Sequence, residues 1–167
     1  MEIYSAIRNR RSVRSYSKYE MPQEDIKIIL EAAMHAPSAK NTRPWEFVVL
    51  KSQDAKDKAM EIHPFSKHLK DASIAIIVCA DVSNLETLKM GYFPQDCGAA
   101  IENILLQSLD LGYGSCWCGI YPDNERVTNF KKEFEIDSIP VALVIIGKAE
   151  SIPNKKGYYE EGKVRFF

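Results

Sequence analysis

The sequence predicts a helix-rich layered α/β or α+β domain built around one central sheet, and three observations carry this prediction. The chain has 167 residues, the size of one domain. Helix-like and strand-like segments are interspersed, but without the regular strand–helix repeat of a parallel fold. The runs 73–80 and 139–149 are apolar enough to be strands buried on both faces. We therefore expect a single domain that covers residues 1–167.

Signals that begin or end helices lie at five places along the chain. Helical spacing of apolar residues predicts a short helix within 1–11 and a second helix that begins at Pro22 and is stopped by Pro37. The other helices are expected at 54–63, at 95–112 and in the segment that Asp123 can cap. Strands are expected at 45–51, 73–80, 113–120 and 139–149, with extended chain or loop at 12–17 and in the tail.

The balance of charge limits the partners that the chain could have. Apolar residues make up 46% of the sequence, charged residues 27%, and the formal net charge is −1. No apolar run approaches the length of a membrane span, and the N-terminus lacks the order of a signal peptide. A nearly neutral chain has no general attraction to nucleic acid or to an anionic membrane. We expect a cytoplasmic protein with neither of these as a partner.

The cysteines and histidines give no metal-binding spacing. The four cysteines do not form the disulfide framework of a small secreted domain. Cys116 and Cys118 are two positions apart, and we expect their side chains to point to opposite faces if the segment is extended. The histidines, His35, His63 and His68, are not paired at ligand spacing, and no glycine-rich dinucleotide or phosphate fingerprint occurs. A metal site, a reactive cysteine pair and ordinary buried thiols are the possible interpretations; we adopt the last and predict no metal.

The stretch "RNRRSVRSY", residues 8–16, places four arginines within seven positions of this nearly neutral chain. Guanidinium groups bind phosphate oxygens through parallel hydrogen bonds, and a serine hydroxyl adds a further donor. Alternation would send Ser12 and Arg14 to the same side of an extended segment. From composition alone two interpretations stay open: a phosphate site, or a solvated basic helix end that the helix dipole favours.

Two further segments favour the phosphate site. The loop "APSAKNTRPW", residues 36–45, is rich in short polar donors such as Ser38 and Asn41. The tail carries Lys163 and Arg165, which lie two positions apart and share a side if the tail is extended. Basic residues from both ends of the chain could therefore meet on one anion.

Four blocks of the sequence, 6–16, 36–50, 96–120 and 139–149, resemble successive blocks of the nitroreductase family of FMN-dependent oxidoreductases. They follow the same order, cover nearly the whole chain, and the first two are the most specific. The resemblance implies an α+β (α/β layered) fold with a central sheet that is mixed but mainly antiparallel and flanked by helices. It also implies an intertwined homodimer, and the length implies a compact member of the family.

By resemblance, the first block would bind the phosphate end of FMN. Arg10, Arg11 and Ser12 would hold the phosphate and the nearby ribityl oxygens. Arg14 would lie near N1 and O2 of the flavin, where reduction places negative charge that a fixed cation stabilises.

The resemblance implies further FMN contacts from two loops and the tail. The P-S-x-x-N loop would come from the partner subunit, the segment "SCWCGI" would place a main-chain N–H at flavin N5, and a basic pair in the tail would close on the phosphate. These residues are Pro37, Ser38, Ala39 and Asn41; Trp117, Cys118 and Gly119; and Lys163 and Arg165.

The activity implied by the resemblance is an FMN-dependent NAD(P)H oxidoreductase that reduces nitroaromatics, quinones or similar small-molecule electron acceptors. Hydride from NADH or NADPH would reach flavin N5, and the acceptor would then occupy the same face, which gives ping-pong kinetics. No side chain is expected to act as an essential acid or base. Two alternatives stay open: an FMN-binding protein without nicotinamide turnover, for flavin storage or other flavin chemistry, and an anion-binding module without flavin.

Overall fold

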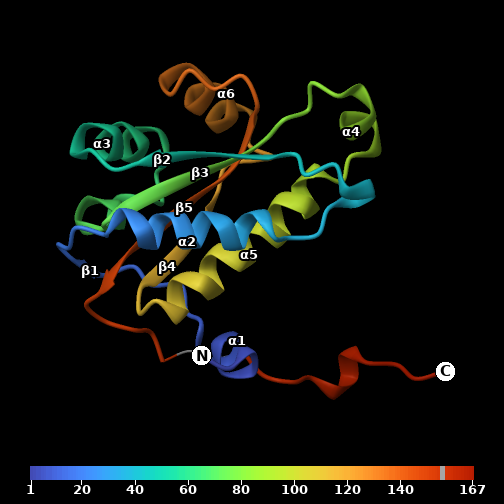
Figure 1. The fold of residues 1–167 in the computed structure, drawn as a ribbon, viewed down its shortest axis with the longest axis horizontal. Coiled ribbons are helices and arrows are strands. Elements are labelled where there is room, and N and C mark those ends of the chain that lie inside the picture. Colours follow the sequence, from blue (N-terminus) through green and yellow to red (C-terminus); the bar gives the residue numbers. More distant parts are fainter. Residues whose placement is uncertain (155–156) are drawn as a thin grey trace.

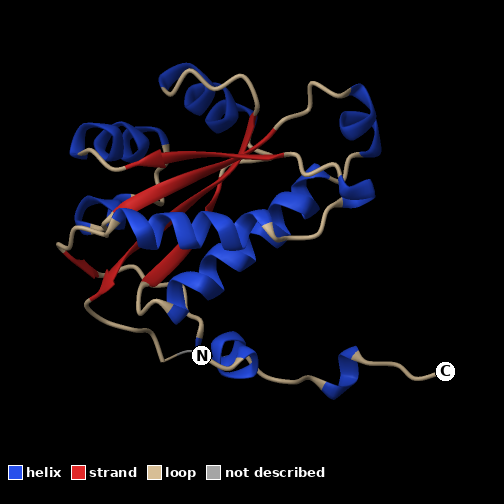
Figure 2. Cartoon of the chain, in the orientation of Figure 1, coloured by secondary structure: helices blue, strands red, loops and turns tan. Residues whose placement is uncertain are grey.

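The computed structural model describes residues 1–154 and 157–167, which form a five-stranded sheet with helices on both faces (Figures 1 and 2). The helices are α1 (Ile3–Asn9), α2 (Gln23–Met34), α3 (Gln53–Ile62), α4 (Leu85–Met90), α5 (Phe93–Asp110) and α6 (Asn124–Glu133). The strands are β1 (Tyr16–Ser17), β2 (Trp45–Leu50), β3 (Ile74–Ala80), β4 (Gly114–Gly119) and β5 (Ile139–Ala149). Three short 3₁₀ turns are η1 (Ala39–Asn41), η2 (Lys67–Asp71) and η3 (Glu161–Lys163). The predicted α+β class is confirmed.

The long strand β5 organises the sheet. It pairs with β3, which in turn pairs with β2, and it also pairs with β4 and, at its C-terminal end, with β1. All of these pairs are antiparallel. A parallel bridge between Ser12 and Ser115 adds the chain before β1 to β4. The sheet is therefore mainly antiparallel with one parallel contact, as the family resemblance implies.

Local sequence signals account for where several helices begin and end. The side chain of Ser52 accepts a hydrogen bond from the N–H of Ala55 at the start of α3. Asp123 does the same for Arg126 at the start of α6, which confirms the predicted cap. Gly112 follows α5 with a φ of +82°, a conformation that glycine adopts without strain. α4 and the 3₁₀ turns were not predicted, because each is too short to show a hydrophobic period.

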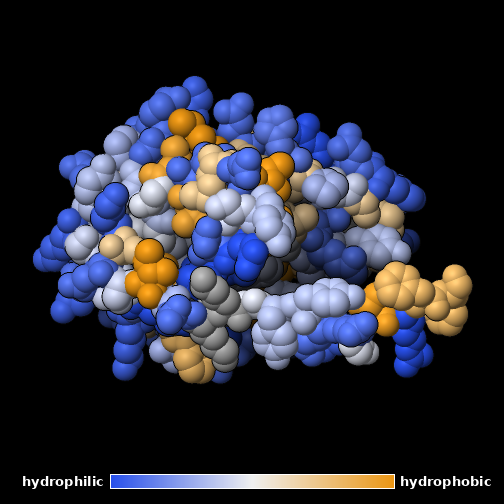
Figure 3. Space-filling model, turned by 90° about the horizontal axis from the view of Figure 1, so that it is seen from below, coloured by the Kyte–Doolittle hydropathy of each residue, from blue (hydrophilic) through white to orange (hydrophobic). Residues whose placement is uncertain are grey.

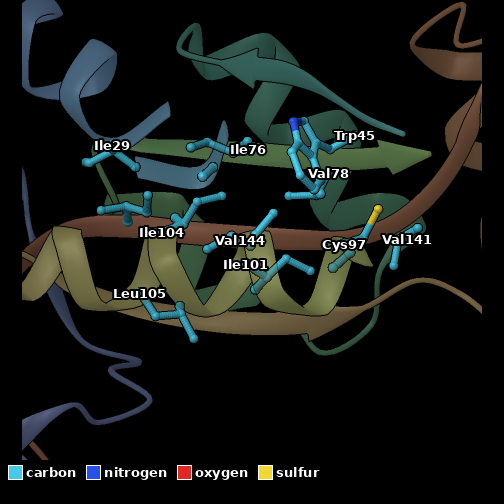
Figure 4. Packing of buried hydrophobic residues seen from close by; sticks show 14 of the residues in the cluster. Ile29, Trp45, Ile76, Val78, Cys97, Ile101, Ile104, Leu105, Val141 and Val144 are labelled. Carbon is cyan, nitrogen blue, oxygen red and sulfur yellow. The ribbon is translucent and has the colours of Figure 1, made fainter. Parts of the chain in front are cut away.

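Two apolar layers cover the sheet. On one face, Ile76 and Val144 pack against α2 and α5, where Figure 4 shows Ile104 among them. On the other face, Leu143 joins a second cluster that includes Phe130 of α6 and residues of α3 and η2. Successive residues of β3 and β5 alternate between these layers, and β3 is buried along its whole length, as its apolar run predicts.

One expectation from the sequence is wrong. Cys116 and Cys118 point to the same face of β4, and both belong to the cluster on the α3 and α6 side. The reason is that residues two positions apart in a strand share a face. Trp117, between them, points to the opposite face and keeps 42% of its surface exposed.

The two chain ends lie outside the layered core. Ala6 is the buried residue of α1, whereas Ile3, Tyr4 and Ile7 are exposed. Residues 157–167, here called the C-terminal arm, run past α1 and end away from the sheet (Figure 1). Figure 3 shows hydrophobic side chains at the free end of this arm, where Phe166 is exposed. No helix within the described part of the chain is both long and apolar enough to cross a membrane.

Candidate functional site

The arginine segment, residues 10–14, is held along the edge of β4. The N–H of Val13 donates a hydrogen bond of 2.9 Å to the carbonyl of Ser115, next to the Ser12–Ser115 bridge. The Val13 side chain lies so close to Gly114 that a Cβ there would be 2.8 Å from it. The missing side chain of Gly114 therefore allows the segment to approach the strand.

Side-chain alternation aims Ser12 toward the same side as Trp117. Val13 is buried in the cluster that contains Cys116, so its neighbour Ser12 faces the other way. Arg14 lies close enough to the same cluster that its charge lowers the pKa of Cys116. Ser12 is half-buried and Arg14 is exposed. No ion pair involves Arg14 among residues 1–154 and 157–167. One face of this edge thus carries a hydroxyl and an exposed indole, and an exposed cation lies on the same segment.

The other two arginines of the segment have partners within the chain. The Nε of Arg10 lies 3.1 Å from a carboxylate oxygen of Glu102 on α5. The Nη1 of Arg11 donates to the carbonyl oxygens of Arg8 and Arg10 at 2.7 Å and 2.6 Å, at the end of α1. A guanidinium has five N–H donors, so these contacts orient both side chains and leave donors for an anion.

At the end of β4, the flat indole ring of Trp117 is exposed near the exposed backbone of Gly119. Trp117 lies over Gly98 of α5, with the ideal Cβ position of Gly98 at 3.6 Å from Cη2 of the indole. Gly119 is exposed, and a Cβ there would meet no atom closer than 4.0 Å.

The sequence analysis did not predict His63 as part of this site. His63 is buried, and its Nε2 atom lies 2.9 Å from the carbonyl oxygen of Gly119. No spacing pattern in the sequence marks this contact between α3's end and β4.

The state of His63 follows from its surroundings. The N–H of Phe65 donates to Nδ1 of His63, so Nδ1 is the acceptor and Nε2–H donates to Gly119. Burial lowers the pKa of His63, and the nearby Arg126 lowers it further. A neutral imidazole therefore fixes the main chain at the end of β4.

The P-S loop, residues 37–43, is positioned by its own hydrogen bonds. The N–H of Ala39 donates to the carboxylate of Asp96 near the start of α5, and the N–H of Arg43 donates to the hydroxyl of Ser38, both at 2.9 Å. Asn41 is exposed, with a φ of +56°. Lys40 and Arg43 also have positive φ. These contacts fix a compact turn with polar groups at the surface.

The chain does not bring all of the predicted residues together. Arg10 and Arg11 line a cavity of about 530 Å³ with residues 157–159 of the C-terminal arm. Pro37, Ser38 and Ala39 line a separate depression, and the two share no residue. Within one chain the arginine segment and the P-S loop therefore line two different hollows.

The basic pair of the tail is also apart from the arginine segment. The Nζ of Lys163 lies 2.7 Å from a carboxylate oxygen of Glu160, and Arg165 is exposed on the C-terminal arm. Figure 1 shows that the arm leads these residues away from the sheet. A single chain does not bring these two residues to the arginine segment, so their contact with a phosphate stays a prediction.

A second group of reactive side chains lies on the opposite face of β4. Cys116, Cys118 and His68 of η2 each offer one ligand atom, and these atoms all lie within 4.8 Å of one another. We call these three residues the sulfur cluster. A hydrogen bond from Cys118 lowers the pKa of the Cys116 thiol, and His68 lowers it further, while the pKa of Cys118 is raised. Strand alternation could have predicted the cysteine pair, but only the folded chain adds His68.

Comparison with known proteins identifies the family. The model of the nitroreductase family matches residues 7–81 and 66–148, which is most of the chain. The matched range includes the arginine segment, the P-S loop and β4. This protein belongs to the nitroreductase family.

Individual relatives agree with this assignment. A Methanothermobacter thermautotrophicus protein named "Putative NADH dehydrogenase/NAD(P)H nitroreductase" is 39% identical over 98% of this chain and 86% of its own length. The structure of "Putative NADH Oxidase" from Clostridium acetobutylicum is 36% identical, with a TM-score of 0.89 and coverage of 96% of this chain and 97% of that chain. An "FMN-dependent Nitroreductase" from Clostridium difficile is 26% identical, with a TM-score of 0.82 and coverage of 97% and 94%.

Proposed function

We propose that this protein is an FMN-dependent NAD(P)H oxidoreductase that reduces nitroaromatics, quinones or similar small acceptors. The observation that carries the proposal is the pairing of the arginine segment with β4, which sets Ser12 on the same side as Trp117 and holds the exposed Arg14 two residues further along the same edge. Family membership and the printed names of the relatives support the same reaction class.

The residues at this edge fit the chemistry of FMN. Its phosphate is an anion that guanidinium and hydroxyl donors bind well, and Arg10, Arg11 and Ser12 offer such donors. Its ring is flat, apolar and large, and the exposed indole of Trp117 beside the uncovered backbone of Gly119 offers a flat surface for it. These features support FMN over a small inorganic anion, because such an anion would make no contact with the indole.

The protein's own groups would bind and orient, while the cofactor supplies the redox chemistry. FMN, when bound, accepts hydride from NADH or NADPH and passes electrons to a second substrate. Arg14 would stabilise the negative charge that reduction places on the pyrimidine end of the flavin. His63 would keep the carbonyl of Gly119 turned away from the ring and so fix the direction of the neighbouring N–H groups. No side chain of this edge is assigned as an acid or base.

We infer that the complete binding site forms between two copies of the chain. The P-S loop and the arginine segment line separate depressions in one protomer, and a two-fold pair can bring one from each copy together. Apolar side chains of α1 and of the C-terminal arm support this inference, since Ile3 is 78% exposed and Phe166 90%. In such a homodimer the arm would also carry Lys163 and Arg165 to the partner.

The visible spectrum of the purified protein tests the proposal. We expect a yellow protein with one FMN per chain, a dimer by light scattering, and rapid anaerobic bleaching by NADH or NADPH in stopped-flow measurements. Reoxidation by a quinone or nitroaromatic should follow ping-pong kinetics. A colourless protein that takes up no FMN on reconstitution would overturn the proposal. Tight FMN binding without bleaching by either nicotinamide would instead favour flavin storage or another flavin reaction.

A further inference from the structure

The sulfur cluster joins three ligating side chains from two segments that are far apart in the sequence. Cys116 and Cys118 come from β4 and His68 from η2, and one ligand atom of each lies within 4.8 Å of the other two. The two cysteines are buried, with 1% and 7% of their surfaces exposed. Their separation along the strand, two residues, directs both sulfur atoms to one point.

His68 shows that this cluster is more than ordinary core packing. Its Nε2 atom is buried and has no hydrogen-bond partner in the described structure. A buried polar atom without a partner is destabilising, and most such atoms have an explanation. The ring of Tyr16 stacks on the imidazole with 6.1 Å between ring centroids, which holds the imidazole in place. One nitrogen of the same imidazole lies within 4.8 Å of both sulfur atoms, so an ion bound between the three side chains would have a nitrogen ligand in reach.

The other two cysteines provide a contrast. Cys97 lies near the carbonyl of Cys79, and Cys79 near the carbonyl of Ile77, so each thiol has a backbone acceptor. Neither is part of a group of three ligating residues within the described ranges. Cys118 also has a backbone acceptor, the carbonyl of Phe65 at 3.9 Å, so the difference lies in the neighbouring side chains. Cys79 and Cys97 pack as small apolar side chains, whereas the pair in β4 lies beside an imidazole.

We infer that His68, Cys116 and Cys118 bind one thiophilic d¹⁰ metal ion, Zn²⁺ or Cu⁺. Two thiolates and one imidazole form a donor set typical of these ions and unsuited to Mg²⁺ or Ca²⁺. Zn²⁺ with two thiolates is neutral overall, which suits an apolar surrounding, and it would take a water molecule as a fourth ligand. Cu⁺ would use the three protein ligands alone. The inference does not rest on the proposed flavin reaction.

A metal ion at this position would connect η2 to β4. It would lie behind the strand whose other face carries Trp117 and adjoins the arginine segment. The ion would therefore brace the strand without facing the proposed flavin. Because both thiols must be deprotonated to bind, metal uptake should release protons and weaken as the pH falls.

Metal titration of the full-length protein tests the inference. The reduced protein, stripped with a chelator, would be titrated with Zn²⁺ or, without oxygen, with Cu⁺, each against a chromophoric competitor of known affinity. We expect one equivalent of either or both ions to bind. X-ray absorption should then give two sulfur and one nitrogen ligand from the protein, and a fourth light ligand only with Zn²⁺.

Matched variants separate the sulfur cluster from general thiol binding. Cys116→Ala and His68→Gln should each lower the affinity for the bound ion at least tenfold, because each removes a ligand. Cys97→Ala, which removes a buried thiol outside the cluster, should leave the affinity unchanged. His68→Gln keeps both thiols and most of the packing, so it provides the test if Cys116→Ala does not fold.

Three results would overturn the inference. The first is binding of well under one equivalent of both ions to the wild-type protein. The second is equal loss of affinity in Cys97→Ala and in the cluster variants. The third is an absorption spectrum with no sulfur ligand, which would show an adventitious ion only.

Discussion

The two faces of β4 are built from neighbouring residues but differ in what they leave open. On one face, Trp117 keeps 42% of its surface exposed, and Ser12 of the paired segment shares that face. On the other face, Cys116 and Cys118 are closed into the core with Leu143. The strand's alternation therefore separates a solvent-exposed surface from a buried layer that stabilises the fold. Substitutions on the two faces should have different consequences, and this difference can be measured.

The largest effect is expected on the closed face, for Leu143→Ala. Leu143 is fully buried and pairs with Cys118 in the register of β4 and β5. Truncation removes apolar contacts and leaves a cavity, so the free energy of unfolding should fall by about 2–5 kcal/mol. Urea denaturation should show this as a lower midpoint with an unchanged slope.

Trp117→Ala is the matched substitution on the open face. It removes a larger side chain, yet much of that side chain is already in contact with water. We expect a smaller loss of stability than for Leu143→Ala, together with weaker FMN binding. If Trp117→Ala destabilises the protein as much as Leu143→Ala does, the distinction between the two faces is wrong.

The next effect is expected for Gly114→Ala, where the arginine segment meets β4. The new Cβ would lie 2.8–2.9 Å from atoms of the Val13 side chain. Relieving this overlap requires the segment to move from the strand, which should cost about 1–3 kcal/mol of stability. Thermal unfolding and FMN titration should both report the change, because the same segment carries Ser12 and Arg14.

Two further variants check the cause of that effect. Adding Val13→Ala to Gly114→Ala should restore part of the stability, since it removes the overlapping atoms. Gly98→Ala places a Cβ in α5 at an ordinary 3.6 Å from Trp117, and alanine favours a helix. It should therefore be neutral or stabilising, and a loss equal to that of Gly114→Ala would contradict the proposed role of close approach.

A smaller effect, confined to ligand binding, is expected for Arg14→Met. Loss of one charge-assisted contact should weaken FMN binding about 10- to 150-fold, because such hydrogen bonds contribute roughly 1.5–3 kcal/mol. The melting temperature of the FMN-free protein should not change, since Arg14 is exposed and unpaired within the described ranges. Fluorescence titration with FMN measures the affinity. Arg8→Met is the control, because Arg8 lies over the Tyr4 ring outside the predicted contacts.

The sequence predicted much of the fold because the main signals are local. The apolar runs predicted β3 and β5, the Asp123 cap predicted the start of α6, and the helix signals predicted α2 and α5. The candidate FMN residues came from a family resemblance, and the structure adds that Ser12 shares a face with Trp117. The assignment of all FMN contacts stays a prediction.

The parts that the sequence did not predict depend on contacts between distant segments. His68 precedes the cysteines of β4 by nearly fifty residues, and only the packing of η2 under the sheet brings them together. The same is true of His63 and Gly119. The expected opposite orientation of Cys116 and Cys118 is a different error, because strand alternation alone excludes it.

The smallest effect is expected from the contact between His63 and Gly119, which lies at the end of β4 between the two faces. Burial lowers the pKa of His63 in the folded state below its ordinary value of about 6.5. Between these two pKa values the unfolded chain therefore binds more protons than the folded chain. The stabilisation that neutral His63 provides is complete above about pH 6.5 and is lost as the pH falls. His63→Gln should show less loss of stability than the wild type between about pH 7 and pH 5, whereas His35→Gln, at an exposed position, should follow the wild type. Parallel curves for all three proteins, measured by denaturation across this range, would mean that the imidazole does not hold the strand end in its neutral form.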